Sequence, residues 1–164
     1  MGAVLLDAVI VPGLTVFPQI SWRWESETDI LSGSYRSPRR GESAETVEMS
    51  SPDGAVAVLD VVNDEICGLD IVIWPDVDTV TDLRPPAPQM AGRVQVPPAD
   101  GPRQVEEALA VTVDGLEQTF HLRIGEQRPV TVVQVADHLL IEVDSQDRVA
   151  GFWLTGVPPF PSEE

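Results

Sequence analysis

The residues of this chain that could perform chemistry are few. It contains two histidines, His121 and His138, and a single cysteine, Cys67. A metal site would have to combine the histidines with carboxylates such as Asp137 or Glu142. The histidines lack the i, i+2 or i, i+4 spacing that brings two imidazoles to one ion, so a structural or solvated role is favoured for both. We therefore predict no metal site, and one cysteine allows neither an internal disulfide nor a cysteine cluster.

Motifs of known catalytic sites are also missing from the sequence. Residues 32–34 (Ser-Gly-Ser) do not lie within a G-x-S-x-G nucleophile turn. The acidic run 76–82 resembles a calcium loop, but it lacks the acid or amide at its fifth position and the glycine at its sixth. All ten basic residues are arginine, so no lysine is present for a Walker-type phosphate loop or a Schiff base. We predict no catalytic residue and no cofactor.

The most cationic segment is a predicted hairpin loop at residues 36–41, which carries Arg36, Arg39 and Arg40. Guanidinium groups bind carboxylates and phosphates through paired N–H donors. Two roles are therefore open for these arginines. They could clamp an anionic ligand, or they could offset the repulsion among acidic residues and meet an acidic patch on a second copy of the chain.

The charge of the whole chain limits its partners. There are 27 acidic and 10 basic residues, with a formal net charge of −17, and the acidic residues are spread along the chain. Such a surface repels nucleic-acid backbones and anionic membranes, so we expect neither as a partner. The apolar segment 3–11 is far shorter than the roughly 20 residues of a membrane span and has no basic start typical of a signal peptide. With its lone cysteine, the chain is expected to be cytoplasmic.

The sequence contains a weak internal repeat. Residues 66–71 align with residues 149–154, and the shared glycines, Gly68 and Gly151, are 151 − 68 = 83 positions apart. Three further pairs of segments align upstream: 59–62 with 141–144, 45–49 with 128–132, and 30–33 with 119–122. What recurs is the alternation of apolar and polar residues, which is the period of a half-buried strand. The repeat predicts two copies of one strand meander.

Residues 141–154 (IEVDSQDRVAGFWL) resemble the closing hairpin of the YuzE-like family of small uncharacterised bacterial domains, in which an acidic apolar strand, a turn and a strand opening with glycine follow one another. Residues 24–31 (WESETDIL) resemble the opening of that family, and residues 113–117 keep this feature only weakly. The resemblance covers about two-thirds of the chain as a tandem pair. It implies no activity, because the family is functionally undefined.

Strand periodicity predicts an all-β fold of two repeated antiparallel strand meanders, packed as a sandwich or flattened barrel. The expected strands are 3–11 and 14–20; 21–25, 30–36, 45–49, 55–62 and 66–74 in the first copy; and 108–113, 119–124, 130–135, 139–143 and 149–155 in the second. Prolines between the copies favour extended, poorly hydrogen-bonded chain. The predicted organisation is N-terminal strands in 1–20, a first β repeat in 21–75, a Pro-rich connector in 76–104, a second β repeat in 105–158 and a tail in 159–164.

The tryptophans are predicted to lie outside the core. If Leu69, Ile71 and Ile73 point inward, then Trp74 points outward, because side chains alternate along a strand. The same reasoning places Trp153 on the outer side, and Trp22 and Trp24 are further candidates for a binding surface. A tryptophan outside a core is covered by a loop, buried in an oligomer interface, or available as a ligand platform, and the first two are favoured.

We expect a non-enzymatic binding or assembly β-domain that associates with itself or with a protein partner. The alternative is a small-ligand-binding protein or enzyme with a pocket between the two repeats, near Arg36, Trp24 and His121. A cavity with convergent polar groups would favour the alternative, and a flat apolar patch would favour assembly.

Overall fold

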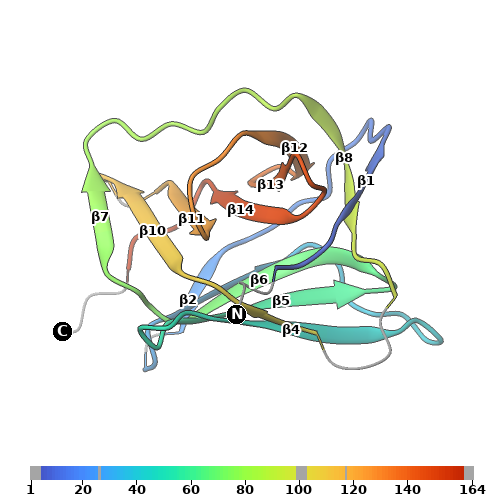
Figure 1. Ribbon diagram of the computed structural model, residues 1–164, viewed down its shortest axis with the longest axis horizontal. Coiled ribbons are helices and arrows are strands. Elements are labelled where there is room, and N and C mark those ends of the chain that lie inside the picture. The colour runs from blue at the N-terminus through green and yellow to red at the C-terminus, as the bar shows by residue number, and fades with distance from the viewer. Residues whose placement is uncertain (1–4, 26, 99–102, 117, 161–164) are drawn as a thin grey trace.

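The computed structural model describes residues 5–25, 27–98, 103–116 and 118–160, which contain strands and turns and no helix (Figure 1). The strands are β1 (Val9–Pro12), β2 (Arg23–Glu25), β3 (Ile30–Ser34), β4 (Ala44–Ser50), β5 (Val56–Val62), β6 (Glu65–Ile73), β7 (Val77–Val80), β8 (Met90–Gln95), β9 (Gln104–Glu106), β10 (Leu109–Asp114), β11 (Phe120–Ile124), β12 (Val130–Ala136), β13 (Leu139–Asp144) and β14 (Val149–Leu154). The all-β prediction is confirmed. Nothing in this part of the chain forms a helix of the length and apolar character needed to cross a membrane.

The ten strands predicted between residues 21 and 155, outside the connector, are all present, and their ends agree with the prediction within two residues. Their alternating residues are the reason. In β10, for example, Leu109, Val111 and Val113 are buried while the residues between them are partly exposed. When apolar residues recur at every second position, a strand places all of them on one face, and that face packs against the core.

Three of the expectations outside these strands are wrong. Of the predicted strand 3–11, residues 3 and 4 lie outside the described residues, residues 5–8 form only an isolated bridge at Asp7, and β1 begins at Val9. Residues 14–20 form no strand: β1 ends at Pro12, Gly13 adopts a positive φ of 108°, and the chain continues irregularly. Residues 76–104 are not merely extended, because they contain β7 and β8, and β9 starts at Gln104. The prolines end before Met90 and resume after Gln95, so the segment between them keeps every N–H that a sheet requires.

The strands form one sheet with the order β7-β10-β11-β14-β13-β12-β8-β6-β5-β4-β9 (Figure 1). Two antiparallel groups, β2-β3-β6-β5-β4 and β10-β11-β14-β13-β12, lie on either side of β8. The sheet curls into a half-barrel. The expectation of purely antiparallel pairing is wrong for β7 with β10, β8 with β12 and β9 with β4, which are parallel. Each of these pairs includes a strand that lies between the two groups in the sequence, where long connections permit parallel pairing.

One hydrophobic core lies inside the curled sheet and joins both groups of strands. It includes fully buried side chains from each, such as Leu69 and Ile71 of β6 and Phe152 of β14. A β-bulge lies near the end of β6, where Ala57 of β5 pairs with Ile71 but the preceding residue, Val56, pairs with Ile73. The extra residue in β6 reverses the predicted inward and outward directions of the side chains that follow it. Ile73 is therefore 52% exposed, and Trp74 packs against the core instead of facing outward.

Candidate functional site

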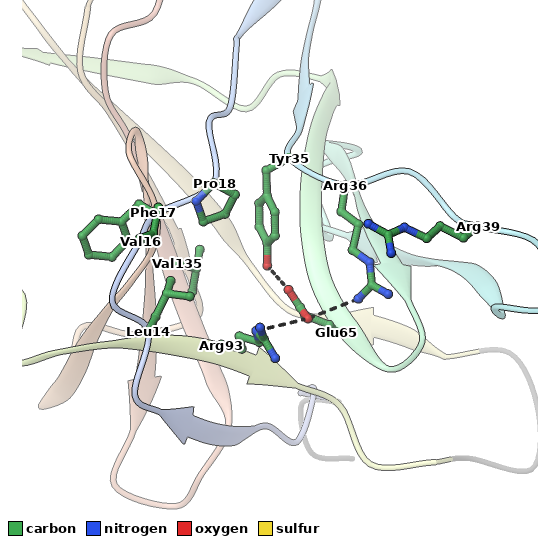
Figure 2. A pocket seen from close by; sticks show the side chains of 10 residues that line it. All are labelled: Leu14, Val16, Phe17, Pro18, Tyr35, Arg36, Arg39, Glu65, Arg93 and Val135. Carbon is green, nitrogen blue, oxygen red and sulfur yellow. Dashed lines mark hydrogen bonds and ion pairs between the residues drawn. The ribbon is translucent and has the colours of Figure 1, made fainter.

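A cavity of about 490 Å³ lies where β8 joins the two groups of strands, and we call it the seam cavity. Its wall combines segments that are far apart in the sequence: the irregular chain before β2, the end of β3, the start of β6, β8 and β12 (Figure 2). The lining residues are Leu14, Val16, Phe17, Pro18, Tyr35, Arg36, Arg39, Glu65, Arg93 and Val135. One wall is thus apolar, and the other carries three guanidinium groups.

Glu65 is the buried charge of the seam cavity, with 6% of its surface exposed. It is the first residue of β6 and pairs with Gln95 of β8, which fixes it at the seam. Its Oε2 lies 2.5 Å from the Tyr35 hydroxyl, and its Oε1 lies 3.4 Å from Arg36 Nη1 and 3.8 Å from Arg93 Nε (Figure 2). A carboxylate can be buried at this depth because these donors replace water.

Tyr35 and the neighbouring Cys67 stay protonated. Burial, together with the hydrogen bond and the charge of Glu65, raises the pKa of Tyr35 far above its usual value, so its hydroxyl donates to the carboxylate. Burial and the charges of Asp60 and Glu65 raise the pKa of Cys67 to about 11. Neither group therefore supplies a base or a thiolate nucleophile near neutral pH.

The seam cavity carries an excess of positive charge in an acidic protein. Arg36 forms ion pairs with Glu42 and Glu65, and Arg93, whose side chain is 55% exposed, approaches Glu65. Arg39 is exposed and makes no ion pair with any described residue. Three arginines against two glutamates leave a charge of 3 − 2 = +1 at this place, in a chain whose net charge is −17.

The apolar wall is formed mainly by residues 14–18, which have no regular structure. The backbone N–H groups of Gly13 and Leu14 both donate to Ala91 O, which ties the start of this segment to β8. At its end, Pro18 O accepts from the N–H of Asp137. Between these anchors Val16 is 79% exposed at the cavity, so apolar surface is left in contact with solvent.

His121 lies in a different cavity, of about 290 Å³, on the outer face of β11, β13 and β14. Its Nε2 is 2.8 Å from Glu142 Oε1, and Trp153 Nε1 donates to Glu142 Oε2 at 3.1 Å. Gly151 lies under this carboxylate, and a Cβ at that position would overlap Glu142 Oε1. Trp153 faces outward as predicted and is covered, in part by Leu83 of the connector. This arrangement fixes His121 and Trp153 in place.

A third cavity, of about 580 Å³, lies over β3 and β6 and is lined by Asp60 and Asp70. Burial, followed by the negative charges of Asp60 and Glu25, raises the pKa of Asp70 to about 6. Burial also raises the pKa of Asp60. Asp60 lies opposite Gly68 as Glu142 lies opposite Gly151, so both groups of strands place an acidic side chain over a glycine.

The remaining tryptophans are structural. Trp22 is buried, and its Nε1 donates to His138 O at 3.2 Å. Trp24 stacks on Trp74 with ring centroids 5.6 Å apart, and its Nε1 donates to Pro158 O at 2.9 Å. These contacts close one end of the core with the C-terminal segment.

The structure does not bring the predicted residues together at one place. Arg36 and Arg39 line the seam cavity, whereas Arg40, which is exposed, does not, and neither Trp24 nor His121 reaches it. Sequence reasoning missed Tyr35, Glu65 and Arg93. One signal pointed to Glu65, since it directly precedes the apolar run 66–69 of a predicted strand, and a glutamate is costly to bury there without a partner.

Two further observations bear on the identity of the site. Within residues 5–25, 27–98, 103–116 and 118–160, no group of three or more histidine, cysteine, aspartate or glutamate side chains is placed to hold a metal ion. Neither a protein-family model nor a curated protein sequence matches this chain.

Proposed function

We propose that this protein is a non-enzymatic binding domain that holds a small organic anion in the seam cavity. The observation that carries the proposal is the excess positive charge around buried Glu65, in a chain that is otherwise strongly acidic. Three guanidinium groups at one cavity, in a chain with only 10 basic residues against 27 acidic ones, favour an anionic ligand over a solubility role.

The protonation states of the cavity support binding rather than catalysis. Tyr35 and Cys67, the groups nearest to Glu65 that could lose a proton, have raised pKa values and remain neutral. The carboxylate of Glu65 is itself occupied, since it accepts hydrogen bonds from Tyr35 and Arg36 and forms a longer ion pair with Arg93. The cavity volume of about 490 Å³ is within the range of about 300–1,000 Å³ typical of small-molecule sites.

The proposal is tested by isothermal titration of the purified protein with small organic acids and with their neutral amides. We expect the acids to bind and the amides not to bind. Arg93→Gln should weaken binding at least about tenfold, the effect of losing one charge-assisted hydrogen bond of about 1.5–3 kcal/mol. Arg84→Gln is the matched control, because Arg84 is 81% exposed and pairs with Asp82 away from the cavity. Equal binding of acids and amides would reject the proposal.

We also propose that residues 21–75 and 105–158 are tandem copies of a YuzE-like unit that pack as a sandwich or flattened barrel. Support comes from the common strand order, in which β2-β3-β6-β5-β4 matches β10-β11-β14-β13-β12. The equivalent glycines, Gly68 and Gly151, also face acidic residues on the adjacent strand in both groups. A test is to express the two halves separately and together and to record whether they reassemble into the native fold.

Self-association is a second candidate function, and one observation favours it. Strand β7 is at the end of the sheet, all four of its residues are exposed, and Val77 and Val80 present apolar side chains. An exposed edge of this kind pairs with another strand. Light scattering of the wild type and of Val80→Lys measures the mass, and a monomeric wild type at high concentration would exclude this function.

A further inference from the structure

We infer that the anion of the seam cavity is a monocarboxylate with an apolar body. Its carboxylate lies on the arginine wall, where Arg93 and Arg39 are the least occupied donors, and its body lies against residues 14–18 and Val135. This inference rests on the proposed function and names the ligand class for the same site. It follows from the charge, the available donors and the apolar wall.

The charge of the cavity fits one negative group. The excess of +1 left after pairing three arginines with Glu42 and Glu65 is neutralised by a single carboxylate. A second negative charge would lie next to Glu65, which is fixed at the cavity wall by Tyr35. Since like charges repel strongly where solvent is partly excluded, a dianion is disfavoured.

The donors are also suited to a carboxylate. Arg36 is occupied by Glu42 and Glu65, whereas Arg93 makes only a long 3.8 Å ion pair with Glu65 and is half exposed. Arg39 is exposed, and its side chain pairs with none of the described acidic residues. Each of these guanidinium groups can bind the two oxygens of one carboxylate through its paired N–H donors. No helix N-terminus borders the cavity in the described residues, so the backbone N–H groups that commonly hold phosphate are not provided that way.

The opposite wall of the seam cavity is suited to an apolar part of a ligand. Five of the ten lining residues are apolar, and the ring of Tyr35 faces Pro18 across the cavity (Figure 2). Val16 is 79% exposed, although valine is usually buried. An apolar ligand body would remove this surface from water, and each buried methylene would contribute about 0.8 kcal/mol, or roughly a fourfold gain in affinity.

The test is a titration series on the intact protein with acetate, butyrate, hexanoate and octanoate, compared with adipate, inorganic phosphate and 1-hexanol. We expect affinity to rise roughly three- to fourfold per methylene along the monocarboxylates. Adipate, phosphate and 1-hexanol should bind at least about tenfold more weakly than hexanoate, the effect of about 1.4 kcal/mol.

Two variants separate the head group from the body. Arg39→Gln should weaken all monocarboxylates by a similar factor, and Val16→Ser should reduce the gain per methylene while leaving acetate unchanged. Both side chains are exposed, so both variants should fold. Phosphate or adipate binding as tightly as hexanoate would overturn the ligand class and leave the proposed function standing. Binding of hexanol as tight as that of hexanoate, or no binding of any acid, would overturn both.

Discussion

The glycine under Glu142 provides the sharpest test of the packing. In Gly151→Ala, the new Cβ would overlap Glu142 Oε1 and would lie 2.8 Å from the backbone oxygen of Leu122. Real Cβ atoms do not approach other atoms this closely, and a backbone oxygen in the middle of β11 has little room to move. The carboxylate must therefore leave its position between His121 and Trp153.

The cost has two parts. Forcing an extra methyl group into a packed place costs about 1–3 kcal/mol. A buried carboxylate that loses its hydrogen bonds from His121 and Trp153 costs about another 1–3 kcal/mol. The sum is a loss of about 2–6 kcal/mol, which in a domain of this size lowers Tm by roughly 4–24 °C.

The assay is urea unfolding followed by tryptophan fluorescence, with Gly115→Ala as the matched control. At Gly115 the nearest atom to a new Cβ is 3.9 Å away and φ is not positive, so this variant should match the wild type or be slightly more stable. On a Glu142→Ala background, Gly151→Ala should cost at least about 1 kcal/mol less, because the overlapping carboxylate is gone. Equal stability of Gly151→Ala and Gly115→Ala, or full additivity with Glu142→Ala, would refute the reasoning.

Three further outcomes are expected. Asp70 has a pKa raised to about 6, so its ionisation destabilises the fold as pH rises through this value; Asp70→Asn should raise the urea midpoint at pH 8 but not at pH 4, and equal gains at both would contradict this. Burial opposes ionisation of Asp144, but its bonds to Arg128 and to backbone N–H groups prevail and hold its pKa below the usual value. Because Asp144 keeps Arg148 and two backbone N–H donors, Arg128→Gln should cost about 1.5–3 kcal/mol at pH 7, and less as pH falls below about 4, as measured by urea unfolding at each pH. Trp24→Phe removes the hydrogen bond to Pro158 O, so the N–H of Val157, which donates to Gln118 O, should exchange faster with deuterium, and unchanged protection of this N–H would contradict the prediction.

Much of the secondary structure could be predicted because its signal is local. The alternation in residues 109–113 or 120–124 is set by the sequence itself, and one face of a strand must be apolar wherever the other meets water. The outward position of Trp153 follows from the same rule, whereas its cover by Leu83 was one of three alternatives that the sequence left open. The exclusion of motifs such as the Walker loop required only that lysine be absent.

The seam cavity could not be predicted, because it depends on which strands become neighbours. Tyr35, Glu65, Arg93 and Val135 belong to four segments that meet only when β8 inserts between β6 and β12. The side of the sheet that Trp74 faces could not be predicted either, because a single bulge in β6 reverses it. The alternation of apolar and polar residues contains no sign of the extra residue.

The sequence by itself determined the ten strands of the two antiparallel groups, the charge and the absence of several known motifs, since these depend on residue types and on spacing along the chain. The tertiary structure alone decided the order of the strands, the parallel pairs and the place where arginines surround a buried glutamate. The physical reason is that any two strands can satisfy each other's backbone hydrogen bonds, so local sequence does not choose between partners. The partners are chosen by the burial of one shared core, whose residues come from segments distant in the sequence.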